Sequence, residues 1–412
     1  MSRTWAIPLL YVVGALGLGF TLPRVEVQFF PESVAGLSAG AAMAIASAIA
    51  SGMISLTGIV FSLAFVMVQF SATAYSPRLV LWVARDRVVS HALGIFTATF
   101  LYALMVLSWV DRNASGRTPL VSGWLVVGLL VASMALFIAL IDRIALLQVN
   151  RMLVFTGDQG REAIAQLYAA AATAKPPEPA SGYEALPVAQ TLVYRGRPRV
   201  IQALEVSRLV ELARAAGGVI ELVASVGDTT LERTPLLRVR GTKAPVDEAQ
   251  LLAGLALGEE RTFEQDPKYA LRLVVDIAIK ALSPAINDPT TAVQALDQVE
   301  DLLVRLGCAE LDVGQYRDAS GALRLVANFP TWEDFLRLGL DEIRYCGGSS
   351  VQVMRRMKAL IKSLLEVLPA SRHAALRTWE ARVQGTIERS FTDALEKQDA
   401  SIADRQGLGI AD

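Results

Sequence analysis

The chain has 412 residues, of which 53% are hydrophobic, and a formal net charge of -1. This balance lacks the basic surplus of nucleic-acid-binding proteins. The sequence has two cysteines, Cys308 and Cys346, and two histidines, His91 and His373. These are too few, and too widely spaced, to predict a disulfide framework, a zinc site or histidine-based acid–base chemistry. Residues 1–150 hold 13 of the 79 charged side chains and no lysine, so the sequence predicts a membrane part followed by a soluble part.

Four apolar segments predict a transmembrane domain over residues 1–145, with spans at about 5–22, 48–70, 91–110 and 120–141. The second segment belongs to a run of about 37 residues without a charge, from Val34 to Phe70. As a helix it would be roughly 55 Å long, which exceeds the bilayer core of about 30 Å. We therefore expect its first part to lie outside the hydrocarbon, to tilt, or to break near Gly52.

Arginines predict the orientation of these spans. With four spans, one side of the membrane holds Arg3, Arg78, Arg85, Arg87, Arg143 and Arg151. The opposite side holds Arg24, Arg112 and Arg117, balanced by Glu26, Glu32 and Asp111. The positive-inside rule then places both termini in the cytoplasm.

Small and weakly polar residues recur at alternating spacings of four and three along the second span, which places them on one helix face. They are Ala44, Ala48, Ser51, Ser55, Gly58 and Ser62, and Phe65 and Gln69 continue the same positions. One interpretation is close helix packing. The other is a pore-lining helix in a homo-oligomer, where small side chains leave room for water and small ions. The two interpretations coincide if the packing occurs between protomers around an axis.

No predicted span has a central acidic or basic residue. Ion-coupled carriers usually need such a group to bind or relay the coupling ion, whereas a passive pore does not. The sequence therefore favours a pore over a secondary transporter.

The predicted fold class is an α-helical membrane domain with about four transmembrane helices, followed by a cytoplasmic α+β domain that becomes mainly helical toward the C-terminus. Residues 146–180 predict a helical connector and a linker, because Lys175–Pro179 is rich in proline. Alternating strands and one short helix predict a small α+β subdomain over 181–260. A mainly helical subdomain is expected over 261–400, followed by frayed final residues.

Within the helical subdomain, Asp266 and Asp288 each precede a proline, which predicts two helix starts. On the first helix, Arg272, Asp276 and Lys280 are spaced to pair along one face. Asn287 and Asp288 offer oxygen ligands to an ion, but two such side chains do not make a site, and helix capping explains them more simply.

The segment Ala281–Ala292, which reads Ala-Leu-Ser-Pro-Ala-Ile-Asn-Asp-Pro-Thr-Thr-Ala, resembles the signature of a bacterial family of predicted membrane proteins known as a domain of unknown function. Residues 51–55, 76–78 and 227–236 look like its other blocks. The family usually has glycine where this chain has Arg233 and Ala285. The resemblance implies a bacterial inner-membrane location and four spans before a cytoplasmic domain, but no particular activity.

The sequence has no phosphate-binding glycine-rich loop after a strand, no nucleophile elbow and no catalytic triad, so we expect no enzyme activity and no cofactor. The leading hypothesis is a homo-oligomeric inner-membrane channel, lined by the second span and regulated by the cytoplasmic domain. Its expected partners are the lipid bilayer, further copies of the chain and small ions, without nucleic acid. The alternative is a membrane-anchored sensor or scaffold that binds a partner or ligand through the helix of Arg272, Asp276 and Lys280 and the Asn287–Asp288 turn.

Overall fold

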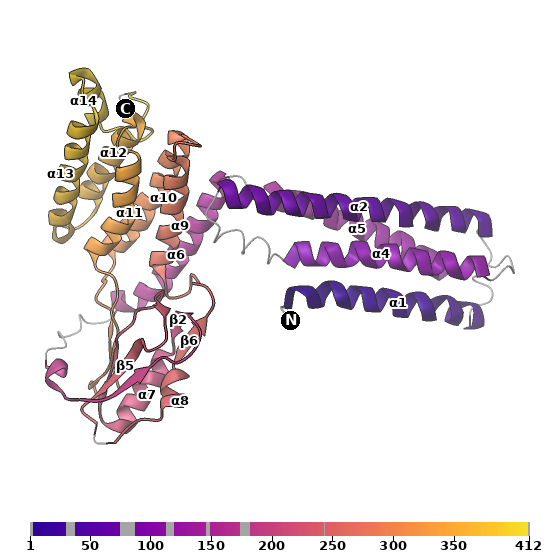
Figure 1. Cartoon of the computed structure of the whole chain (residues 1–412), viewed down its shortest axis with the longest axis horizontal. Helices are drawn as coiled ribbons and strands as arrows, with labels where there is room; N and C mark the ends of the chain where they lie inside the picture. The colour runs from indigo at the N-terminus through magenta and orange to yellow at the C-terminus, as the bar shows by residue number, and fades with distance from the viewer. Residues whose placement is uncertain are drawn as a thin grey trace. The chain divides into compact units, whose positions relative to one another are not determined.

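The computed structural model describes residues 3–29, 38–74, 87–112, 119–145, 149–173, 182–242 and 244–410. The chain divides into two compact units, Met1–Val149 and Asn150–Asp412 (Figure 1). The expected linker at Lys175–Pro179 and the loop residues Arg78, Arg85, Arg117 and Glu32 lie outside the described residues.

Four helices of the first unit are long and apolar enough to cross a membrane, as the sequence predicts. They are α1 (Arg3–Phe29), α2 (Ala39–Ala74), α4 (Arg87–Arg112) and α5 (Leu120–Ala145). Helix α4 is the centre of the bundle, because α1, α2 and α5 all pack against it. Gly94 on α4 permits a close approach to α1, since a Cβ atom added there would lie 2.5 Å from Cδ2 of Tyr11.

The structure excludes one of the three alternatives for the second span. Helix α2 does not break near Gly52 but runs unbroken from Ala39 to Ala74. A glycine inside a helix costs only about 1 kcal/mol, whereas a break within a membrane would leave backbone groups without partners. Helix α1 extends beyond the predicted first span, through Pro23 to Phe29.

Helix α6 (Val149–Thr173) lies in the second unit except for its first residue, and it contacts helices of that unit. Two glycines allow this approach. A Cβ atom on Gly157 would lie 2.1 Å from Oε1 of Gln298, and one on Gly160 would lie 2.8 Å from Cδ2 of Leu302. Arg161, the next residue along the helix, forms an ion pair with Asp301 at 2.7 Å. The helix that follows the last span is therefore held firmly within the soluble unit.

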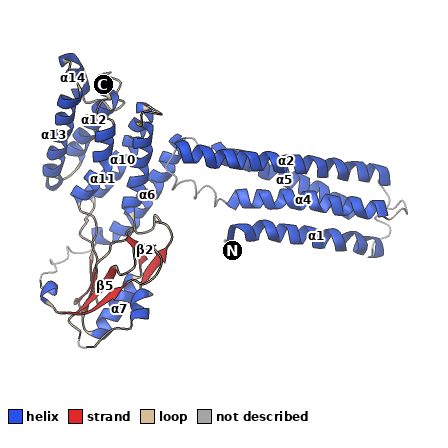
Figure 2. Cartoon of the chain, viewed as in Figure 1, coloured by secondary structure: helices blue, strands red, loops and turns tan. Residues whose placement is uncertain are grey.

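The soluble unit contains a five-stranded and a three-stranded sheet, drawn in red in Figure 2. The strands are β1 (Val188–Val193), β2 (Arg199–Leu204), β3 (Val219–Leu222), β4 (Thr229–Thr230), β5 (Pro235–Arg240), β6 (Leu255–Gly258), β7 (Gln315–Arg317) and β8 (Leu323–Val326). The larger sheet has the order β1-β5-β3-β8-β7, with β3 and β8 parallel and the other pairs antiparallel. The smaller sheet is antiparallel and has the order β4-β2-β6.

Short helices complete this α+β part: η2 (Tyr183–Ala185), α7 (Val206–Ala216) and α8 (Glu248–Leu252). Its core joins residues from helices and from both sheets, among them Ile201, Leu209, Ile220 and Leu236. The turn at Arg233 forms although the family that this chain resembles usually has glycine at this position. Arg233 adopts a left-handed backbone conformation there, with φ of 67°.

The remainder is helical, as predicted. Its elements are α9 (Pro267–Ala281), α10 (Pro289–Cys308), α11 (Trp332–Cys346), α12 (Val351–Val367), η3 (Ala370–Arg372), α13 (His373–Ser390) and α14 (Ala394–Ser401). Helix α9 is buried on nearly all sides and packs against α10 and α11.

The tail residues as far as Ile410 are not frayed, which corrects the expectation for the described part of this end. The Asp404 side chain is buried and accepts a 2.8 Å hydrogen bond from the backbone nitrogen of Gln406. The side chain of Gln352 on α12 donates to the carbonyl oxygen of Gln406 at 3.3 Å. The tail as far as Ile410 is thereby attached to α12.

Candidate functional site

The small-residue stripe of α2 lies on the exposed face of this helix. All eight of its positions are exposed in the protomer, namely Ala44, Ala48, Ser51, Ser55, Gly58, Ser62, Phe65 and Gln69. Among the α2 residues whose burial is described, Ala46, Ile49, Ala50, Met53 and Val60 are buried, and all of them except Ala46 belong to the core of the membrane bundle. At about 100° per residue, the buried set lies roughly opposite the stripe. The stripe therefore does not serve packing against the other described helices of the chain.

The local geometry of the stripe leaves its surface shallow and weakly polar. The Ser55 hydroxyl donates to the carbonyl oxygen of Ser51 at 3.1 Å, one turn earlier, so its donor is satisfied within the helix. A Cβ atom added to Gly52 or Gly58 would meet no atom within 4 Å. Large apolar side chains flank the stripe and are also exposed, among them Ile54 at 56% and Ile59 at 53%. Such a face can admit the backbone of another helix or border a water-filled space.

A buried carboxylate lies near the end of α1, at a position where the sequence predicts only a charge outside the membrane. Glu26 is 2% exposed, and its side chain accepts hydrogen bonds from the backbone nitrogens of Val121 at 2.6 Å and Ser122 at 3.0 Å. The Ser122 hydroxyl donates to the same carboxylate at 3.1 Å. Glu26 therefore caps the positive N-terminus of α5 from a different helix.

Further polar side chains pair inside the membrane bundle. Thr99 on α4 and Ser133 on α5 are fully buried, and their hydroxyls lie 3.0 Å apart. The Tyr11 hydroxyl lies 3.1 Å from Nδ1 of His91, with the two rings edge to face. These pairs join α4 to its neighbours and satisfy groups that would be costly to bury alone.

In the soluble unit, the expected charge row on α9 is only partly assembled. Arg272 donates to Asp276 at 2.8 Å, but it also binds Glu342 on α11, with a second nitrogen 3.0 Å from that carboxylate. Lys280 has no ion pair among the described residues. The hydrogen bond from Arg272 lowers the pKa of Glu342, and Glu342 in turn raises the pKa of Arg272. This network joins two helices of the same unit.

The structure gives Asn287 and Asp288 different roles. The Asp288 carboxylate accepts from the backbone nitrogen of Thr291 at 3.0 Å, which is the geometry of an N-cap for α10. Asn287 is exposed and adopts a left-handed backbone conformation, with φ of 48°. Within the part of the chain that is described, no group of three or more His, Cys, Asp or Glu side chains is arranged to hold a metal ion.

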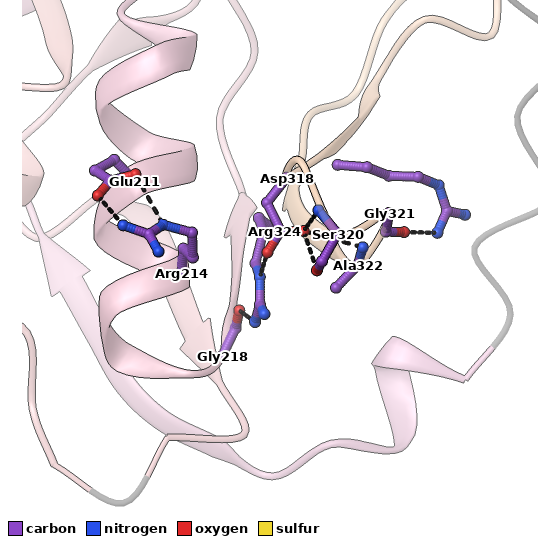
Figure 3. Close-up of polar contacts among 9 residues, drawn as sticks. Glu211, Arg214, Gly218, Asp318, Ser320, Gly321, Ala322 and Arg324 are labelled. Carbon is purple, nitrogen blue, oxygen red and sulfur yellow. Dashed lines mark hydrogen bonds and ion pairs between the residues drawn. The ribbon is translucent and has the colours of Figure 1, made fainter.

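A second carboxylate turn closes the β7–β8 hairpin (Figure 3). Asp318 accepts from the backbone nitrogens of Ser320 at 2.9 Å and Ala322 at 3.2 Å, and from Nε of Arg324 at 2.7 Å. Arg324 also donates to the carbonyl oxygen of Gly218 at 3.2 Å, which ties the hairpin to the segment after α7. Hydrogen bonds from the Ser320 side chain and from Arg324 hold the pKa of Asp318 well below its usual range.

Two open cavities flank the loop between β8 and α11. One of about 440 Å³ is lined by Tyr183, Gln315, Trp332 and Arg372 together with Glu310, Asp312 and Glu333. The other, of about 610 Å³, is lined by Lys268 and Arg337 among others. Arg372 is already engaged with the carbonyl oxygens of Gly307 and Ala309. Neither cavity gathers an arrangement of side chains typical of catalysis.

Comparisons with known proteins agree with this architecture. A family model described as "Predicted membrane protein (DUF2254)" matches residues 1–363. The uncharacterized protein Mb1321c of Mycobacterium bovis is 28% identical over 414 residues, covering 96% of this chain and 78% of the relative. The uncharacterized protein Rv1290c of Mycobacterium tuberculosis shows the same identity and the same coverage of both chains. No solved structure matches the chain. Because the family model covers most of its length, this chain belongs to the family of predicted membrane proteins designated DUF2254.

Proposed function

We propose that this protein is a homo-oligomeric membrane pore rather than an enzyme, with α2 facing the axis and the soluble unit regulating opening. The observation that carries the proposal is the complete exposure of the α2 stripe, opposite the face that packs in the protomer. Helix packing within the chain does not account for Ser51, Ser55, Gly58 and Ser62 at these positions. Packing between copies, or contact with water at an axis, does account for them.

The chemistry of the stripe supports a passive pore. It offers hydroxyls, one side-chain amide and small groups, but no ionised side chain. The buried carboxylate of Glu26 is engaged by the N-terminus of α5, so it is occupied as a structural cap. A stripe of this kind would pass small ions or polar solutes without coupling them to a proton or a second ion.

The proposal includes a bacterial inner-membrane location with both termini in the cytoplasm. The distribution of arginine supports it, because Arg78, Arg85 and Arg87 follow the second span and Arg143 and Arg151 follow the fourth. The same argument places the soluble unit on the cytoplasmic side. Reporter fusions at residue 412 and in the loop at 113–118 test this orientation.

The test is to purify the full-length protein in detergent, to determine its oligomeric state, and to record ion flux after reconstitution. Ser55→Leu and Gly58→Leu should each reduce conductance while the oligomer persists, because the larger side chains would narrow the axis. Gly14→Leu on the exposed face of α1 is the matched control, since a Cβ atom there also meets nothing within 4 Å. Unchanged flux in correctly assembled Ser55 and Gly58 variants would contradict the pore.

A monomer, or an oligomer that stays silent at varied pH, tension and voltage, would favour a membrane-anchored sensor or scaffold. One observation favours this second function. The loop Pro284–Asn287 is exposed throughout, with Ile286 at 43%, and Asn287 is held in a left-handed conformation. Backbone conformations of this kind cluster at binding surfaces. Ile286→Asp should then abolish binding of the partner and leave the melting temperature of the protein unchanged.

A further inference from the structure

An arginine-rich surface lies at the edge of the α+β part, where two loops are joined by hydrogen bonds. The first, Tyr194–Arg199, is the loop between β1 and β2 with the first residue of β2, and the second, Thr230–Thr234, is the last residue of β4 with the loop to β5. At one end the backbone nitrogen of Arg233 donates to the Tyr194 carbonyl oxygen at 2.9 Å. At the other end the Thr230 hydroxyl donates to the Arg199 carbonyl oxygen at 3.0 Å. We name this pair of loops the arginine platform.

The platform concentrates positive charge that the protein does not neutralise. Arg195, Arg197, Arg199 and Arg233 are all exposed, and among the described residues none of their guanidinium groups has an ion pair or hydrogen bond. The platform has a single carboxylate, Glu232. Elsewhere in the same unit many arginines are paired. Examples are Arg240 with Glu221, Arg261 with Asp266 and Arg356 with Glu300.

The backbone that carries these arginines is fixed. The Tyr194 side chain is 8% exposed, and its hydroxyl donates to the Arg197 carbonyl oxygen at 2.6 Å across the loop. The backbone nitrogen of Tyr194 donates to Thr234 at 2.8 Å, and that of Thr234 donates to Leu231 at 2.9 Å. The backbone that carries the four guanidinium groups is therefore already ordered before a ligand binds. Binding then costs less conformational entropy than it would in a flexible loop.

We propose that the arginine platform binds the phosphate headgroups of anionic phospholipids at the bilayer surface. Guanidinium groups form paired hydrogen bonds with phosphate oxygens, and several together complement a negatively charged surface. Leu231 lies on the same platform and is 55% exposed, so the platform combines positive charge with an apolar side chain suited to the headgroup–acyl boundary.

The tether to the membrane favours lipid over a soluble phosphate compound. Helix α6 starts at Val149 and α5 ends at Ala145, so only three residues separate a membrane helix from the soluble unit. Lipid headgroups are consequently present at a high effective concentration around this unit. The proposal rests on membrane anchoring and does not depend on the pore.

The test uses the full-length protein with Cys308→Ser, Cys346→Ser and Leu231→Cys, labelled with an environment-sensitive fluorophore. It is reconstituted into vesicles of phosphatidylcholine alone or of phosphatidylcholine and phosphatidylglycerol in equal amounts. With phosphatidylglycerol we expect a blue shift of the emission and quenching by spin-labelled lipids, both reversed by high salt. A label at Leu395→Cys on α14, where the leucine is 70% exposed, provides the control position.

The charge variant is Arg195→Gln, Arg197→Gln and Arg199→Gln combined, which should lower the ratio of bound to free platform about 100-fold. The matched control changes Arg208, Arg377 and Arg405 to Gln, because these residues are also exposed and carry no ion pair among the described residues. It should leave the signal unchanged. Three outcomes would overturn the proposal: equal signals in the two lipid mixtures, equal losses in the two triple variants, or a response to inorganic phosphate without one to phosphatidylglycerol.

Discussion

The carboxylate of Glu26 lies 3.0 Å from the backbone nitrogen of Ser122, 96 positions later in the chain, and caps a helix to which it does not belong. Helix N-termini expose backbone N–H groups that have no partner within the helix. In an apolar environment such groups need an acceptor, and α1 supplies one from its last turn. The cap therefore holds the end of α1 at the start of α5.

Replacing Glu26 should weaken the membrane bundle. Glu26→Ala removes an acceptor of three hydrogen bonds, and we expect a loss on the order of 2–3 kcal/mol. Glu26→Gln should cost less, because one side-chain oxygen remains. Thermal unfolding of the full-length protein in detergent measures both effects. Asp111→Asn is the control, since Asp111 is an exposed carboxylate at the end of α4; an equal loss in that variant would contradict the capping role.

Arg233 offers a route to a more stable protein. Its φ of 67° lies in the region that side chains disfavour by about 1–2 kcal/mol. Arg233→Gly should therefore raise the free energy of unfolding of the soluble unit by up to about 1 kcal/mol, after the added freedom of the unfolded chain is subtracted. Arg208→Gly, at an exposed position inside α7, should lower it by about 1 kcal/mol. Chemical denaturation gives both values, and a loss of stability in Arg233→Gly would show that the arginine side chain itself stabilises the turn.

Asp318 should make the stability of the soluble unit depend on pH. Hydrogen bonds from Ser320 and Arg324 lower the pKa of this carboxyl in the folded state. The contribution of the ionised Asp318 carboxylate to the free energy of unfolding is therefore complete above the pKa of this group in the unfolded chain, near 3.8. It is lost as the pH falls through the lower pKa of the folded state. Asp318→Asn should lower the melting temperature at neutral pH and have less effect as the solution becomes strongly acidic.

A series of melting curves across this range measures the Asp318 effect. Asp312→Asn provides the comparison, because Asp312 is exposed and its side chain has no ion pair or hydrogen bond within the described residues. If the difference between Asp318→Asn and the parent protein were constant with pH, the contribution of the charged carboxylate would be refuted.

The contact of α6 with α9 and α10 depends on Gly160. A Cβ atom there would lie 2.8 Å from Cδ2 of Leu302 and 3.0 Å from the Ala270 Cβ atom, so Gly160→Ala should cost about 1–3 kcal/mol through overpacking. Gly385→Ala on α13 meets only the flexible end of Arg389 and should stabilise the protein by up to about 1 kcal/mol. Chemical denaturation measures the change in the free energy of unfolding for each variant. A change in the same direction for both variants would contradict the close packing of α6.

The sequence predicted the four spans and most soluble elements because their signals are local. Long apolar runs mark the spans, and α9 and α10 start where an aspartate precedes a proline. Helix α7 and strand β5 each end directly before a glycine, which is another local signal. Four helices apolar enough to cross a membrane, followed by a mixed α/β region and then by helices, are thus confirmed.

Features that depend on distant residues were not predicted. The burial of Glu26 depends on α5, and the partner that completes the Arg272 network, Glu342, comes from α11. Strand β4 has two residues and β6 has four, too few for a periodic pattern. The sequence did not show which way the α2 stripe faces, because small residues suit a contact within the chain as well as a contact with another molecule. The stripe is exposed because α2 packs on α4 through its opposite face.

The central position of α4 has a consequence for how the protein enters the membrane. In the described segments, α1 and α2 pack mainly on α4. In the proposed membrane arrangement, spans leave the ribosome in chain order, so α1 and α2 would reach the bilayer before α4. Until α4 (Arg87–Arg112) has been synthesised and has left the ribosome, α1 and α2 lack the helix on which they both pack. A nascent chain stopped before α4 is therefore expected to be a better substrate for membrane quality-control proteases than one stopped after it.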